Sequence, residues 1–170
     1  MNREHWDERY GTEELIWKAE PNRFLVEELD ALAPGRALDV ACGEGRNAVW
    51  LASKGWRVTG VDFSRAGLAK AQRLATDRDV EVTWVEADVV EWQPPSVSFD
   101  VVVVMYLHLP AEQRRKALAR AAAALAPGGI LLVERCSYLS TPKSLTRRLD
   151  TGPGAVGTPP ESAHCPFLFY

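Results

Sequence analysis

The sequence predicts a single α/β domain built on a doubly wound, mainly parallel β-sheet. Two observations predict it. Helical and strand-like patterns alternate regularly from about residue 22 to residue 135, and such alternation implies parallel strands joined by right-handed crossovers. The chain has 170 residues, of which 46% are apolar, so it fits one domain with a core of its own.

The first half of the alternation begins with a helix that Asn22 is suited to cap and that Pro34-Gly35 ends. Short apolar runs and helical patterns alternate after it. The expected elements are a strand over 37–41, a glycine turn over 42–45, a helix over 46–53, a strand over 57–61 and a helix from Ser64, a second N-cap, to about Thr76.

The second half continues in the same way. A period of two predicts a strand over 80–87, and the continuous apolar run at 99–104 is typical of a strand buried on both faces. An Ala-rich helix over 111–126 follows, Pro127-Gly128-Gly129 ends it, and 130–133 form the last strand. Because such sheets bind ligands beyond the carboxyl ends of their strands, the residues after each strand are the site candidates.

Residues 138–170 depart from this pattern and are expected to be irregular, since Ser, Thr, Pro and Gly dominate them. The strand at 130–133 would then be an exposed sheet edge, which invites pairing with another chain. We therefore expect low stability, a homodimer through this edge, or pairing of the edge with the terminal Phe167–Tyr170.

Charge and cysteine content exclude several classes of protein. A net charge of -3 argues against a nucleic-acid-binding surface. The longest uncharged apolar stretch, 101–107, is too short for a membrane span, and the N-terminus lacks a secretory pattern. The three scattered cysteines form neither a disulfide framework nor a zinc site. We expect a cytoplasmic protein without a metal site and with neither a nucleic-acid nor a membrane partner.

Three candidate sites follow the predicted strands. Gly43 and Gly45 belong to a G-x-G-x-x-A turn that lets backbone N–H groups approach a ligand, although an ordinary tight turn has the same pattern. Asp62, 19 residues after Gly43, is placed to accept ribose hydroxyls, and an acid also suits the start of the next helix. Asp88 follows the third strand and suits either an adenine amine or a solvated loop.

Together, the motifs resemble those of a known enzyme family. The family is that of the class I S-adenosylmethionine-dependent methyltransferases. Its first two motifs resemble the segment ALDVACGEGRNAVWLASKGWRVTGVDFS, and its later motifs resemble the segments EAD, FDVVVVMYLHLP and LAPGGILLVE. The resemblance covers roughly residues 6–135. Two segments of the chain are similar to the small-molecule subgroup around the tellurite-resistance methyltransferases. They are GRN, after the glycine turn, and WDERYGTEELIWKAEPN, near the start.

The resemblance implies a Rossmann-like sheet of strand order 3-2-1-4-5 with helices on both faces, and S-adenosylmethionine as the cofactor. It implies that the methionine portion is surrounded by Asp39, Ala41, Gly43 and Gly45. It implies that the nucleoside is bound by Asp62 at the ribose, Phe63 on the adenine (a position that core packing explains equally well), and Asp88 at the adenine amine between Ala87 and Val89. The C-terminal hairpin of the family is missing or altered here.

The substrate side follows the fourth strand. Methyl transfer from a sulfonium needs the acceptor held on axis and away from water, and a base only where the acceptor loses a proton. Tyr106 suits the methyl site, with its ring face toward the sulfonium, or core packing. His108 suits a general base or a loop position near a helix start.

The chain is accordingly divided into a lid segment at 1–21, a cofactor-binding methyltransferase domain at 22–137 and the irregular tail at 138–170. The lid aromatics Trp6, Tyr10 and Trp17 would contact the ligand or dock the segment on the domain. We expect methyl transfer to a small-molecule acceptor. One alternative is a non-catalytic cofactor-binding or partner-binding protein with an incomplete substrate pocket, and another is an NAD-type oxidoreductase, which Asp39 and Asp88 disfavour.

Overall fold

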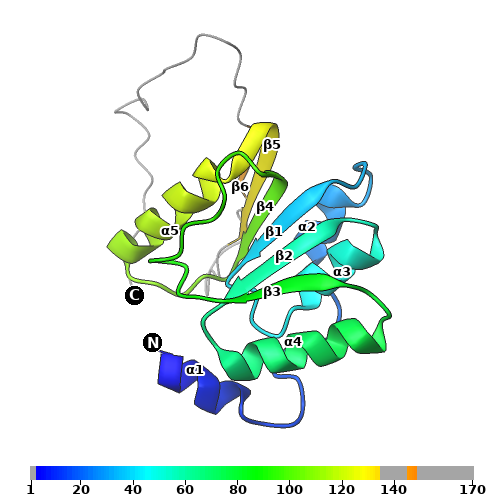
Figure 1. Cartoon of the computed structure of the whole chain (residues 1–170), viewed down its shortest axis with the longest axis vertical. Coiled ribbons are helices and arrows are strands. Elements are labelled where there is room, and N and C mark those ends of the chain that lie inside the picture. The colour runs from blue at the N-terminus through cyan, green and yellow to red at the C-terminus, as the bar shows by residue number, and fades with distance from the viewer. Residues whose placement is uncertain (1–2, 135–144, 149–170) are drawn as a thin grey trace.

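One β-sheet with helices on both faces forms the centre of the computed structural model, which describes residues 3–134 and 145–148 (Figure 1). The strands are β1 (Arg36–Val40), β2 (Arg57–Asp62), β3 (Val82–Glu86), β4 (Phe99–Met105), β5 (Leu125–Glu134) and β6 (Leu145–Arg148). Within these residues their order is β3-β2-β1-β4-β5-β6. β1 to β5 pair in parallel, so the predicted order 3-2-1-4-5 is confirmed.

The helices of the described residues cover the two faces of the sheet, apart from the first, which packs on the fourth. They are α1 (Arg3–Tyr10), α2 (Arg23–Leu29), α3 (Arg46–Ser53), α4 (Arg65–Asp77) and α5 (Ala111–Ala123). Val101 and Val103 of β4 pack with apolar side chains of α2 and α3, whereas Val102 and Val104 pack with alanines of α5. All four valines are at most 1% exposed, as expected for a strand between two helical layers.

The order of the strands places a ligand crevice next to β1. The chain passes from β1 to β2 on one side and returns to β4 on the other, and a doubly wound sheet opens a crevice at such a reversal. The helices that begin near it are capped as predicted: Asn22 Oδ1 accepts from the N–H groups of Phe24 and Leu25, and Ser64 Oγ accepts from that of Gly67.

One helix was not predicted, and one local prediction was wrong. Residues 3–10 form α1, which the sequence does not reveal because its charged residues leave no apolar stripe. The Ala-rich helix ends at Ala123, and Pro127-Gly128-Gly129 lies inside β5. The pairing with β4 jumps from Phe99↔Leu125 to Val101↔Ile130, so these residues are accommodated as an irregularity of the strand.

The expectation of an irregular chain over 138–170 was wrong for β6. This strand pairs antiparallel with β5, from Ile130↔Arg148 to Val133↔Leu145. The edge of β5 that we expected to be exposed is therefore covered, which removes the reason given for a dimer through it. The other residues of the tail, with the predicted pairing of Phe167–Tyr170, lie outside the described residues.

Candidate functional site

A pocket lies at the carboxyl ends of β1, β2 and β4, at the predicted crevice. Its walls come from the turn after β1, from Asp62 and Phe63, from Val89 and from residues 105–109. The N-terminal segment adds Trp6, Tyr10 and Trp17. Of the predicted site residues, the pocket brings together Ala41, Gly43, Asp62, Phe63, Val89, Tyr106 and His108.

The turn after β1 has a left-handed backbone at Ala41, Gly43 and Gly45, with φ of 58°, 53° and 77°. A Cβ on Gly43 would lie 2.7 Å from the Tyr10 hydroxyl, so only glycine allows Tyr10 to approach. Gly45 has a different role, because its Cβ would lie 2.6 Å from that of Ala71. Gly45 thus permits close packing of α3 against α4 and is not part of the pocket wall.

The Asp62 carboxylate is held by the backbone around it. Its Oδ2 accepts from the Gly43 N–H and its Oδ1 from the Ser64 N–H, both at 2.9 Å. Burial raises the pKa of Asp62, and the two N–H donors oppose that rise. A carboxylate has about four acceptor positions, so each oxygen keeps capacity for a further donor from the pocket.

Asp39 lies beneath the turn and does not line the pocket. It is 1% exposed, and burial raises its pKa to about 7 although the Ala48 N–H opposes the change. Its Oδ2 has no hydrogen-bond partner in the part of the chain that the structure describes. An unpartnered buried acceptor of this kind fits a cationic donor brought by a ligand.

The predicted adenine-binding residues are only partly brought together. Phe63 and Val89 line the pocket, and the Arg3 guanidinium lies 6.0 Å from the centre of the Phe63 ring. Asp88 is exposed, and its Oδ1 accepts from the Val90 N–H at 2.8 Å. Neither Asp88 nor its half-buried neighbour Ala87 belongs to the pocket wall.

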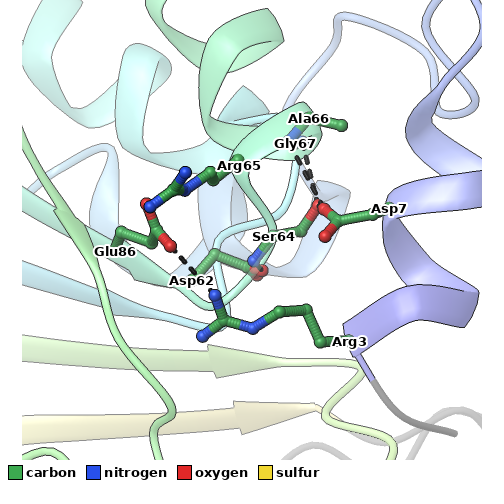
Figure 2. Close-up of polar contacts among 8 residues, drawn as sticks. All are labelled: Arg3, Asp7, Asp62, Ser64, Arg65, Ala66, Gly67 and Glu86. Carbon is green, nitrogen blue, oxygen red and sulfur yellow. Dashed lines mark hydrogen bonds and ion pairs between the residues drawn. The ribbon is translucent and has the colours of Figure 1, made fainter.

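Helix α1 is docked on the start of α4 by polar contacts (Figure 2). Asp7 Oδ1 accepts from Ser64 Oγ at 2.5 Å and from the Ala66 N–H at 3.4 Å. Arg3 and Arg65 both pair with Glu86, at 2.9 and 2.7 Å. The residue that caps α4 therefore also holds the N-terminal segment over the pocket.

A buried ion pair, which the sequence analysis missed, fixes the rest of that segment. Lys70 Nζ lies 2.9 Å from Glu44 Oε1, and these side chains are 7% and 3% exposed. The Glu44 carboxylate also accepts from the N–H groups of Ile16 and Trp17, both at 3.0 Å. No local pattern reveals this pair, because its two members lie on different elements 26 residues apart.

The residues after β4 form the opposite wall. Tyr106 has φ of 56°, a conformation that bulky side chains rarely adopt, and burial together with Glu134 raises the pKa of its hydroxyl. The His108 ring centre is 6.1 Å from that of Trp6. Burial, and secondarily Arg9, lowers the pKa of His108, which favours the uncharged imidazole near neutral pH.

Neither a metal site nor a membrane-spanning helix is found among the described residues. Three or more side chains of the metal-ligating types nowhere come close enough there to hold an ion. Among the helices of residues 3–134, none has the length and apolarity needed to cross a membrane.

A doubly wound sheet, a glycine turn after β1 and a buried carboxylate after β2 define a domain that binds a nucleotide-type cofactor. Residues 37–129 match the family model described as methyltransferase domain. The chain belongs to this family, which confirms the predicted class of S-adenosylmethionine-dependent methyltransferases.

Two relatives are named as methyltransferases of small molecules. Over 122 residues the chain is 39% identical to demethylmenaquinone methyltransferase of Thermus thermophilus, covering 71% of this chain and 54% of the relative. It is 33% identical over 134 residues to trans-aconitate 2-methyltransferase of Rhodopseudomonas palustris, covering 77% and 50%. The chain thus spans about half the length of the curated relatives it matches.

A solved structure agrees with the fold. The S-adenosylmethionine dependent methyltransferase from Mesorhizobium loti superposes with a TM-score of 0.58 at 27% identity, over 66% of this chain and 51% of that one. None of these three relatives bears on the tellurite-resistance subgroup, which stays a prediction.

Proposed function

We propose that this chain binds S-adenosylmethionine in the pocket beside β1 and β2 and positions a small-molecule nucleophile for in-line methyl transfer. The observation that carries the proposal is the Asp62 carboxylate. Both of its oxygens are oriented by backbone N–H groups and each retains acceptor capacity, which suits the two adjacent hydroxyls of a ribose.

Other predicted residues suit the remaining parts of the same ligand, strand by strand along the edge of the sheet. Phe63 and Val89 offer apolar walls for the adenine beside β2 and β3, and the turn at Ala41 and Gly43 approaches the methionine portion. The unpartnered oxygen of Asp39 fits the positive charge at that end. Asp88 and Ala87 stand outside the pocket wall, so their contact with adenine requires the loop after β3 to close on the ligand.

The cofactor supplies an already activated methyl group, and the residues of this chain hold the two reactants and exclude water. The N-terminal segment is the lid in this proposal, because Trp6, Tyr10 and Trp17 line the pocket. His108, uncharged near neutral pH, is the candidate base for an acceptor that must lose a proton. A cytoplasmic location and a homodimer remain predictions.

Isothermal titration calorimetry with S-adenosylhomocysteine tests the cofactor assignment, with NADH as the competing ligand. The informative variant is Asp62→Asn, which keeps one carbonyl oxygen for a backbone donor and loses the charge. We expect the wild type to bind S-adenosylhomocysteine and not NADH, and the variant to bind about tenfold or more weakly, since charge-assisted hydrogen bonds are lost. Glu81→Ala, an exposed position away from this pocket, serves as the matched control.

The alternatives predict different results. NADH binding that Asp62→Asn abolishes would favour an oxidoreductase. Binding of S-adenosylhomocysteine without turnover of S-adenosylmethionine on a panel of phenols, thiols, amines and carboxylates would favour a non-catalytic cofactor-binding protein. A folded wild type that binds neither ligand would refute the proposal.

A further inference from the structure

A buried polar network lies behind the Tyr106 wall of the pocket. Asn22 Nδ2 donates to the Tyr106 hydroxyl at 3.1 Å and also to Glu134 Oε2. The backbone N–H of Asn22 donates to Asn47 Oδ1 at 2.8 Å. The network thus joins the start of α2, the first turn of α3 and the ends of β4 and β5.

Glu134 is an unusual residue for this place. Its carboxylate belongs to a residue that is 8% exposed, and among the described residues no Lys or Arg forms an ion pair with it. Its side chain accepts from the Asn22 amide, which also donates to the Tyr106 hydroxyl. A buried carboxylate without a cation is unfavourable, so this position calls for a role other than stability.

The hydrogen bonds leave Tyr106 little freedom. Its hydroxyl accepts from the Asn22 amide, and burial together with the nearby Glu134 raises its pKa, so the phenol stays protonated. The hydroxyl is therefore a poor proton acceptor for a substrate. The ring, anchored at its far end and held at a left-handed backbone position, is the part of Tyr106 that the pocket can use.

The register of the strands places that ring next to the methionine side of the pocket. Val40 of β1 pairs with Val104 of β4, and Met105 pairs with Glu134. Tyr106 therefore follows β4 beside the turn that begins at Ala41, one strand further than the ribose-binding position at the end of β2. A sulfonium at this end would meet an aromatic face, which attracts cations.

We propose that Glu134 is a positioning residue which, with Asn22, fixes the Tyr106 ring against the sulfonium end of the cofactor. This inference rests on the proposed function. It predicts that the anchored ring contributes a preference for the cationic S-adenosylmethionine over the neutral S-adenosylhomocysteine, because only the cation gains from the ring face.

Calorimetry with both compounds measures that preference as the ratio of their dissociation constants. Tyr106→Leu should reduce the preference about tenfold. Tyr106→Phe and Glu134→Ala, which release the anchor in different ways, should each reduce it about threefold to tenfold. The Tyr106→Phe/Glu134→Ala double variant should reduce the preference no further than either single variant does, since both changes remove the same coupled interaction. Glu81→Ala should leave the ratio unchanged.

Glu134→Gln separates positioning from charge. The Gln side chain keeps an oxygen that can accept from the Asn22 amide, so a positioning role predicts a ratio close to that of the wild type. If Glu134→Gln loses the preference as fully as Glu134→Ala, Glu134 acts on the cation by its charge and the proposal is wrong.

The test does not depend on every variant being stable enough to fold. Should Glu134→Ala fail to fold, Tyr106→Phe carries the comparison, because its ring and backbone are retained. An unchanged ratio in variants that still bind S-adenosylhomocysteine would overturn this inference alone. A wild type that binds neither compound would instead overturn the proposed function, and this inference with it.

Discussion

At the residue scale, the buried carboxyl of Asp39 makes stability depend on pH. Burial raises its pKa from 3.8 to about 7, so between these values the folded protein holds a proton that the unfolded chain has released. The free energy of unfolding should therefore be highest at acidic pH on this account and fall as pH rises toward 7. Asp39→Asn should remove about 1–4 kcal/mol of that change.

Urea unfolding at several pH values between about 4 and 8 measures the effect. Asp39→Asn should keep part of the dependence of the unfolding free energy on pH, because the pKa of Asp62 is raised in the same direction. Parallel curves for wild type and Asp39→Asn would show that Asp39 ionises normally in the folded protein.

The residues that the sequence predicted well are those whose role depends on local chain geometry. Gly43 and Asp62 follow neighbouring parallel strands, so topology alone brings them to the same edge of the sheet, and the Gly43 N–H indeed donates to Asp62. Gly45 belongs to the same motif but packs against Ala71. The motif therefore predicts where glycine is needed and not which neighbour requires it.

At the element scale, α4 and the N-terminal segment are joined by the Glu44–Lys70 pair. Lys70→Met would leave the Glu44 carboxylate buried without its cation, so we expect a loss of roughly 3–5 kcal/mol in the free energy of unfolding. Lys54→Met is the matched control, because Lys54 pairs with Asp30 where both side chains are about half exposed, 46% and 52%. Such surface pairs contribute about 0–1 kcal/mol.

Chemical unfolding of the two variants gives the comparison. Hydrogen exchange adds a local readout, since residues 12–17 should exchange faster in Lys70→Met and not in Lys54→Met. Equal losses of stability in both variants would contradict the view that burial makes the Glu44–Lys70 pair important.

Elements with a strong local sequence pattern were predictable, and elements that depend on contacts with distant residues were not. β4 was evident from its continuous apolar run, and it is the most buried of β1 to β5. Helix α1 is held by Asp7 and Arg3, which contact residues 57 and 83 positions away. β6 exists through its pairing with β5, and neither arrangement leaves a pattern in the segment itself.

At the scale of the whole molecule, binding of the cofactor should couple to global stability. The pocket is built from β1, β2, β4 and the N-terminal segment, so a ligand there binds only the folded chain. S-adenosylhomocysteine at 100 times its dissociation constant should stabilise by about 2.7 kcal/mol, which corresponds to a rise in Tm of roughly 5–10 °C for a chain of this size.

Thermal unfolding with and without the ligand measures this rise. The same concentration should shift the Tm of Asp62→Asn much less, because the variant would lose the proposed ribose contact. A large shift that persists in the variant would place the ligand elsewhere on the molecule.

The Asn22–Glu134 contact also has a consequence for the order of events during synthesis. Its partners are 112 residues apart, so a ribosome that adds about 5–20 residues per second delivers Glu134 roughly 6–22 seconds after Asn22. The glycine turn and Asp62 emerge well before the Tyr106 wall is anchored. A nascent chain therefore passes through a period in which the proposed nucleoside side of the pocket has been synthesised and the Tyr106 wall has not yet been anchored. Apolar surface left exposed in such an interval makes a chain prone to aggregation.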